Sequence, residues 1–178
     1  MVKAKNRQTG EIVAIKCIND NFDNPYACRK LLREIKIMRK LSQIENNIFT
    51  PRLIDVIIPT QPALEGDSTK SSLTGNFKIE DAQNFQSIKF AKTHLFLVME
   101  FIENDMKNMM NDVSLVELRE EHIVTIMYNA LCSLKFVHSC NIIHRDLKPA
   151  NFLIDLKCGV KICDFGLART MPKKDKFW

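Results

Sequence analysis

Alternation of apolar and polar residues predicts three β-strands in the first hundred residues. Each candidate is short, rich in β-branched side chains and bounded by turn residues, which is typical of a half-buried strand. In the first of them the alternation places Ala14 and Lys16 on one face and Val13 and Ile15 on the other. The three predicted strands are residues 11–18 (EIVAIKCI), 52–59 (RLIDVIIP) and 94–100 (HLFLVME).

Helical periodicity predicts two longer elements. The first begins at Asn24-Pro25, a capping residue followed by a first-turn proline, and its apolar residues recur at helical spacing as far as Leu41. Glu34 lies on or beside that apolar face, where a carboxylate is costly without a cation. The second helix spans residues 119–138 approximately. Its predicted apolar face consists of Ile123, Met127, Ala130, Leu131, Leu134 and Val137.

The order of these elements predicts an α+β chain of two lobes. A sheet-plus-helix lobe comes first, a polar break follows at EFIEND, and the second helix opens a mostly helical lobe. Residues 60–92 are rich in Ser, Thr, Gly and charge and are interpreted as a long, partly disordered insertion.

The composition restricts the expected cellular location of the protein but does not indicate its function. The 178 residues are 46% hydrophobic, enough for a real core, and contain no apolar run long enough to span a membrane. Six cysteines without a Cys-x-x-Cys pair indicate reduced thiols rather than a metal cluster. A cytoplasmic or nuclear location is therefore expected. The net charge of +5 suits a phosphorylated small molecule as well as a polynucleotide and does not decide between them.

Residues 142–169, IIHRDLKPANFLIDLKCGVKICDFGLAR, hold several polar side chains within an otherwise apolar stretch. Phosphoryl transfer requires a carboxylate that orients an alcohol and accepts its proton, and Asp146 is the candidate base. It also requires metal ions, and Asn151 and Asp164 are candidate oxygen ligands for Mg²⁺.

A cation on the nucleotide phosphates completes this set. Lys16 is the candidate, held in place by Glu34. An isolated lysine in a strand is usually a solvated residue, but a carboxylate that leans toward a core favours a paired lysine here.

These residues resemble the signature set of the eukaryotic protein kinases. The set appears as VAIK (13–16), Glu34 on the following helix, HRDLKPAN (144–151) and DFG (164–166). FDNPYACRKLLREIKIMRKL, FLVMEFIENDM, NIIHRDLKPANFLI and KICDFGLAR are similar to the mitogen-activated protein kinase group in particular. The resemblance implies a protein-kinase-like two-lobe fold, with an N-lobe at 1–99, a hinge at 100–105 and a partial C-lobe at 106–178.

The same resemblance implies an ATP- and Mg²⁺-dependent protein serine/threonine kinase acting in intracellular signalling. Lys148, two residues after Asp146, implies Ser/Thr rather than Tyr specificity, and Arg145 implies regulation through a phosphate or acidic group in the activation segment. The implied partners are ATP, protein substrates with Ser or Thr, and an upstream activating kinase, with no nucleic acid and no membrane. The nucleotide-contacting residues implied are Val2, Ala14, Lys16, Met99, Glu100, Ile102, Asp105, Asn151, Leu153 and Asp164.

Some family features are absent from the sequence. No glycine-rich loop precedes VAIK and neither Thr-x-Tyr nor Ala-Pro-Glu follows DFG, so a kinase truncated at both ends is expected. The alternative is a catalytically silent remnant that acts only as an interaction module. Two further readings stay open at Cys163, which is either a small buried apolar residue or a thiol reachable by electrophiles. His144 is interpreted as a structural residue that packs under Phe165.

Overall fold

The computed structural model describes residues 1–19, 24–57, 77–79, 94–111 and 118–171. Residues 77–79 are the part of the predicted insertion that falls within it; the rest of that segment lies outside the described residues. The chain forms two compact units, and each is described by itself. One unit comprises Met1–Cys28 and Arg52–Phe101, and the other comprises Arg29–Pro51 and Ile102–Trp178.

The first unit contains a five-stranded antiparallel sheet with the strand order β3-β5-β2-β1-β4. The central strand β2 pairs with β5 from Val13 opposite Glu100 to Asn19 opposite His94. Because successive side chains of a strand point to opposite faces, alternate residues form one buried cluster, which includes Val13, Ile15 and Phe96. The strands are β1 (Val2–Asn6), β2 (Ile12–Asn19), β3 (Leu53–Ile57), β4 (Phe77–Ile79) and β5 (His94–Glu100).

Two of these strands were not predicted from the sequence. β1 pairs with β2, and a tight turn connects the two strands. In this turn Asn6 accepts hydrogen bonds from the backbone N–H groups of Gln8 and Gly10, and Gly10 has a φ of 75°. β4 pairs with β1 from within the predicted insertion. β1 carries two buried residues, Val2 and Ala4, so its apolar pattern alone is weak.

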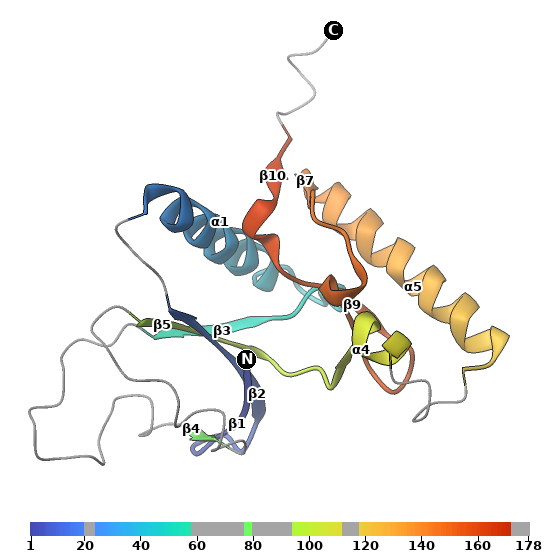
Figure 1. Ribbon diagram of the computed structural model, residues 1–178, viewed down its shortest axis with the longest axis horizontal. Helices are drawn as coiled ribbons and strands as arrows, with labels where there is room; N and C mark the ends of the chain where they lie inside the picture. Colours follow the sequence, from blue (N-terminus) through green and yellow to red (C-terminus); the bar gives the residue numbers. More distant parts are fainter. Residues whose placement is uncertain (20–23, 58–76, 80–93, 112–117, 172–178) are drawn as a thin grey trace, which may run out of the picture. The chain divides into compact units, whose positions relative to one another are not determined.

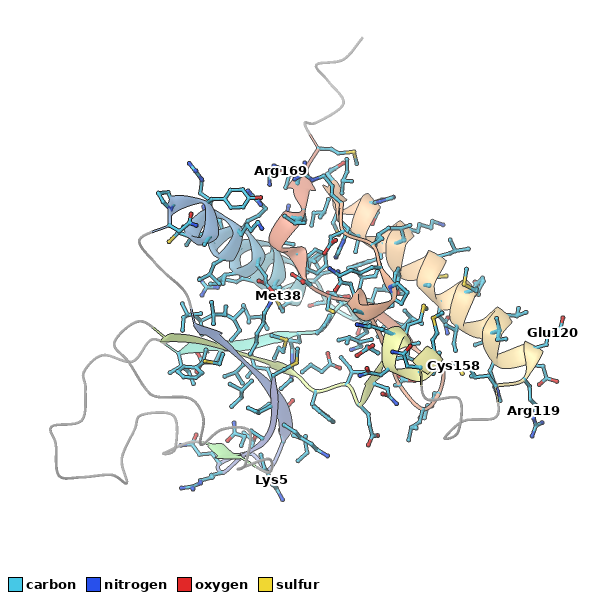
Figure 2. The ribbon with its side chains drawn as sticks, viewed as in Figure 1. Lys5, Met38, Arg119, Glu120, Cys158 and Arg169 are labelled. Carbon is cyan, nitrogen blue, oxygen red and sulfur yellow. The ribbon has the colours of Figure 1, made fainter. Side chains whose placement is uncertain are left out.

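Helix α1 (Pro25–Ser42) begins where the sequence predicts. The Asn24 side chain accepts a hydrogen bond from the backbone N–H of Tyr26 at 2.9 Å and so caps the first turn. The prediction that Glu34 shares the apolar face is confirmed, since the residue is 6% exposed. Met38, labelled in Figure 2, is buried on the same face. The buried residues of α1 are Leu31, Glu34, Ile37, Met38 and Leu41.

The second unit contains the remaining helices and two small sheets. A three-stranded sheet has the order β6-β8-β9, and a two-stranded sheet pairs β7 with β10 (Figure 1). No helix in the described part of the chain is long and apolar enough to cross a bilayer. The elements are β6 (Asn104–Asp105), α4 (Met106–Asn111), α5 (Glu120–Ser139), β7 (Ile142–Ile143), η1 (Pro149–Asn151), β8 (Phe152–Ile154), β9 (Val160–Ile162), η2 (Phe165–Leu167) and β10 (Arg169–Thr170).

The buried face of α5 differs from the predicted one. Ala130 and Val137 are buried as predicted, but Ile123, Met127 and Leu131 are each more than half exposed. On the buried face, Ile126 and Ala130 pack with Ile154 and Val160 of the β8–β9 hairpin. The Ser133 hydroxyl on this face lies 2.7 Å from the carbonyl oxygen of Val160 and 2.9 Å from that of Asn129 in its own helix. The buried residues of α5 are Ile126, Ala130, Ser133 and Val137.

The predicted α+β fold is confirmed. The structure contains an antiparallel sheet, a helix and the start of a helical region. Residues 29–51 belong to the second compact unit, whereas the predicted N-lobe of residues 1–99 includes them. The predicted hinge at 100–105 brackets the change of unit between Phe101 and Ile102.

Candidate active site

The loop between β7 and η1 brings two predicted catalytic residues, Asp146 and Lys148, together with Asn151 of η1, a predicted metal ligand. The Nζ of Lys148 lies 2.7 Å from Oδ2 of Asp146. The side-chain amide of Asn151 donates to the backbone carbonyl of Asp146 at 2.8 Å and to its Oδ2 at 3.2 Å. Asp146 is partly exposed, and the hydrogen bond from Lys148 lowers the pKa of its carboxyl group. That hydrogen bond also raises the pKa of Lys148, so both groups favour their charged forms.

The His144 ring contacts the backbone at two points and holds this loop in place. Its ring is buried, Nε2 lies 2.8 Å from the carbonyl oxygen of Cys163, and Nδ1 lies 3.3 Å from the backbone nitrogen of Asp146. Because the backbone N–H must donate to Nδ1, the proton on the neutral ring is on Nε2, where it reaches the Cys163 carbonyl. The Phe165 ring lies edge-on at 5.2 Å between centroids. His144 thus joins the loop of Asp146 to the segment that carries Asp164.

The β8–β9 hairpin brings the two predicted metal ligands to the same place. Phe152 pairs with Ile162, and the next residue along, Cys163, donates its N–H to the carbonyl of Asn151 at 3.0 Å. Asp164 follows directly, in a left-handed conformation with φ 65°. Its charge contributes to the raised pKa of Lys148, as expected for a nearby carboxylate.

The chemistry of these donors fits Mg²⁺. The Asn151 amide nitrogen is engaged with Asp146, so its oxygen is the atom that the side chain offers to a cation. With the Asp164 carboxylate this gives two hard oxygen ligands, and Mg²⁺ in nucleotide sites typically uses one or two carboxylates together with phosphates and water. The described residues contain no group of three or more His, Cys, Asp or Glu suited to a metal ion.

The predicted nucleotide contacts of the first unit lie on adjacent strands. Ala14 on β2 is directly opposite Met99 on β5, and Lys16 is opposite Leu97. Val2 on β1 is opposite Ile15. The N–H of Glu100 donates to the carbonyl of Arg52 at 2.9 Å, so the predicted adenine contact of Glu100 depends on its carbonyl oxygen. The sheet therefore holds this set in a fixed register.

The second unit holds the remaining predicted contacts. Asp105 on β6 is directly opposite Leu153 on β8, and Ile102 is half-buried. The carboxylate of Asp105 accepts hydrogen bonds from the backbone and side-chain nitrogens of Asn108 at 2.8 and 2.9 Å. In this state Asp105 therefore caps the start of α4, while its assignment to a ribose stays a prediction.

Lys16 and Glu34 belong to different units, Lys16 to the sheet and Glu34 to the part of α1 in the second unit. Their ion pair stays a prediction. Cys163 is half-buried, and both interpretations of its thiol remain open.

Sequence reasoning missed the polar residues that hold the hairpin against α5. Asn129 donates to the carbonyl of Cys158 at 2.8 Å, and Ser133 donates to that of Val160. Cys158 is labelled in Figure 2 at the turn of the hairpin. Both residues lie within an apolar helical pattern, and the only signal in the sequence is their own spacing of four.

Comparison with known proteins decides the family, because the sequence matches the family described as Protein kinase domain over residues 1–178. The chain belongs to the protein kinase family. Among similar proteins are Mitogen-activated protein kinase homolog 1 of Petunia hybrida and Mitogen-activated protein kinase homolog NTF3 of Nicotiana tabacum, both 37% identical over 97% of this chain. Mitogen-activated protein kinase 1 of Oryza sativa subsp. japonica is 36% identical over the same share.

The chain covers 36%, 37% and 35% of the lengths of these three relatives. It therefore spans about a third of the curated kinases that it matches.

Proposed function

We propose that this chain contributes the phosphotransfer site of an ATP-dependent protein serine/threonine kinase of the mitogen-activated type. The observation that carries the proposal is the convergence of Asp146, Lys148 and Asn151 within hydrogen-bonding distance, with Asp164 held beside them by the Cys163–Asn151 backbone bond. The family provides the reaction class, and these residues provide its local geometry.

Each residue has a distinct part in this proposal. Asp146, kept ionised by Lys148, orients the hydroxyl of a Ser or Thr and accepts its proton. Lys148 places a positive charge beside the Asp146 carboxylate. There it can stabilise the negative charge that develops on the phosphoryl group during transfer. Bound Mg²⁺ would neutralise charge on the nucleotide phosphates, and the oxygens of Asn151 and Asp164 would hold it.

The nucleotide is proposed to be ATP, with its phosphates contacted by Lys16, which Glu34 orients. Burial of Glu34 supports this assignment, since a buried carboxylate is stabilised by a cation. Val2, Ala14, Met99, Glu100, Ile102, Asp105 and Leu153 are the proposed remaining nucleotide contacts. Protein substrates with Ser or Thr, an upstream activating kinase, and a cytoplasmic or nuclear location complete the proposal.

The test is phosphotransfer from radiolabelled ATP to a library of Ser- and Thr-containing peptides. Asp146→Asn keeps the size of the side chain but removes the base, and a fall of roughly a hundredfold or more is expected. Glu45→Gln, which changes an exposed carboxylate, serves as the matched control and should match the parent chain.

Equal rates for Asp146→Asn and the parent chain would contradict catalysis at this site. That result would favour the alternative of an interaction module, for which ATP turnover has no role.

A further inference from the structure

The segment after Asp164 is held by a side chain from α1 that belongs to no predicted site. The guanidinium Nη1 of Arg33 donates to the carbonyl oxygen of Gly166 at 2.7 Å. Arg33 is half-buried and Gly166 is buried, so this bond is partly shielded from water. Arg33 immediately precedes Glu34, and both residues and η2 lie in the second unit.

The turn that receives this bond is short and begins in an unfavourable conformation. η2 spans three residues, and its last turn is closed by a backbone bond from the N–H of Ala168 to the carbonyl of Phe165 at 3.1 Å. Asp164, just before it, has a positive φ of 65°, which is uncommon for a residue with a side chain. Such a conformation persists only when the surrounding structure fixes it. Contacts to η2 therefore help to determine where the Asp164 carboxylate points.

A second arginine contacts the next carbonyl of the same turn. Nε of Arg145 donates to the carbonyl of Leu167 at 2.8 Å, and Arg145 directly precedes Asp146. Two consecutive carbonyls of η2 are thus each bound by a guanidinium, one from α1 and one from the loop of the candidate base. Arg145 is exposed, whereas the Arg33 contact lies on the buried Gly166, so loss of Arg33 leaves the less hydrated carbonyl without this donor.

We infer that Arg33 is a positioning residue: its bond to Gly166 fixes η2 and thereby the orientation of Asp164 as a cation ligand. This inference rests on the proposed function, because it assumes that Asp164 holds the Mg²⁺ of a bound nucleotide. Helix α1 would then act on the site in two ways. Glu34 would orient Lys16, and Arg33 would hold the main chain next to Asp164. A charged donor makes the stronger type of hydrogen bond, which is why an arginine suits this position.

The test compares Arg33→Ala, Arg33→Lys and Arg39→Ala in the chain of residues 1–178. Arg39 is an exposed arginine on the same helix and provides the matched control. Hydrogen exchange is measured at the amide of Ala168, whose bond closes η2. Fluorescence titration of a labelled ATP analogue is carried out at increasing Mg²⁺ and also without a divalent cation.

Loss of a charge-assisted bond changes a local equilibrium by about tenfold or more. Arg33→Ala should therefore speed exchange at Ala168 by about this factor and raise the Mg²⁺ concentration for half-maximal binding several-fold, with binding in the absence of Mg²⁺ unchanged. Arg33→Lys should recover part of both effects. Arg39→Ala should behave as the parent chain.

Unchanged exchange or an unchanged Mg²⁺ requirement in Arg33→Ala overturns the inference. A mere loss of folding would weaken binding with and without Mg²⁺ alike and would not be recovered by Arg33→Lys, which also overturns it. If the parent chain itself shows no Mg²⁺-dependent binding, the proposed function fails and the inference falls with it. The parent titration distinguishes that outcome from a failure of Arg33 alone.

Discussion

Asp146 and Lys148 form a close ion pair that contributes most to the acid–base state of the candidate base. Lys148 lowers the pKa of Asp146 below its ordinary value of 3.8 mainly by donating a hydrogen bond to the carboxylate. A group whose pKa is lower in the folded state stabilises the fold above its unfolded pKa, and this contribution is lost as the pH falls through the folded pKa. The Asp146 carboxylate should therefore remain ionised throughout the neutral and mildly acidic range.

We predict that Lys148→Met raises the pKa of Asp146 toward 3.8, because both the hydrogen bond and the positive charge are removed. Carbon-13 NMR titration of the Asp carboxyl carbons measures this directly. Lys157→Met, at an exposed lysine in the hairpin turn, is the control and should leave the pKa of Asp146 as it is. A pKa of Asp146 that does not move in Lys148→Met would contradict the pairing.

The carboxylate of Asp155 lies against Gly159 in the hairpin turn. Oδ1 of Asp155 accepts hydrogen bonds from the backbone N–H groups of Lys157 and Gly159, each at 2.8 Å. A Cβ at position 159 would lie 2.5 Å from Oδ2 of Asp155, closer than two such atoms can approach. The exposed Asp155 side chain can move aside, but it then weakens its hydrogen bonds to the turn, so we predict that Gly159→Ala lowers the free energy of unfolding by about 1 kcal/mol.

A double-mutant cycle in urea unfolding separates this clash from a general effect of the substitution. In an Asp155→Ala background the added methyl group meets no carboxylate, so Gly159→Ala should cost much less there. Equal costs in the two backgrounds would show that Asp155 is not the obstacle.

At the scale of elements, periodic apolar patterns predicted the strands and helices that carry most of the buried surface. β2, β5 and α1 begin and end within about two residues of the prediction, the usual uncertainty of element boundaries. β1 and β4 were missed because their position depends on pairing with partners along the sheet rather than on their own pattern. The local sequence does not encode which strand edge a short segment joins.

The residues of the candidate site also fall into those that the sequence predicted and those that it did not. Asp146, Lys148, Asn151 and Asp164 could be predicted because they belong to a motif with fixed spacing. Arg33, Asn129 and Ser133 could not, because each acts on a main-chain carbonyl that is remote in sequence. Every residue has a backbone carbonyl, so the residue type does not show which carbonyl accepts the hydrogen bond.

Ser133 tests how much α5 relies on such a bond to hold β9. Its side chain is fully buried, and its hydroxyl reaches the carbonyl of Val160 at 2.7 Å. We predict that Ser133→Ala lowers the free energy of unfolding by about 1–3 kcal/mol, because the buried carbonyl loses its donor. Ser139→Ala, at an exposed position of the same helix, is the control in thermal unfolding and should cost less. Equal losses in both variants would contradict a special role for Ser133.

At the scale of the whole molecule, the outer face of α5 carries several exposed apolar side chains. Its large apolar side chains are between 51% and 67% exposed and follow helical spacing, so they form one continuous strip. Exposed apolar strips of this kind drive association with other surfaces. The strip consists of Ile123, Val124, Met127, Tyr128 and Leu131.

We predict that the 178-residue chain self-associates through this strip and that Leu131→Lys increases its monomeric fraction. Leu131 is 62% exposed, so a lysine there removes apolar surface from the strip without displacing a buried group. Sedimentation velocity across a range of protein concentrations measures the monomeric fraction, and thermal unfolding should show little change. Ala130→Lys is the matched contrast, because Ala130 is 8% exposed and a lysine there must enter the core and destabilise the fold. If Leu131→Lys associates as strongly as the parent chain, the strip is not the contact surface, and association must depend on a different part of the molecule.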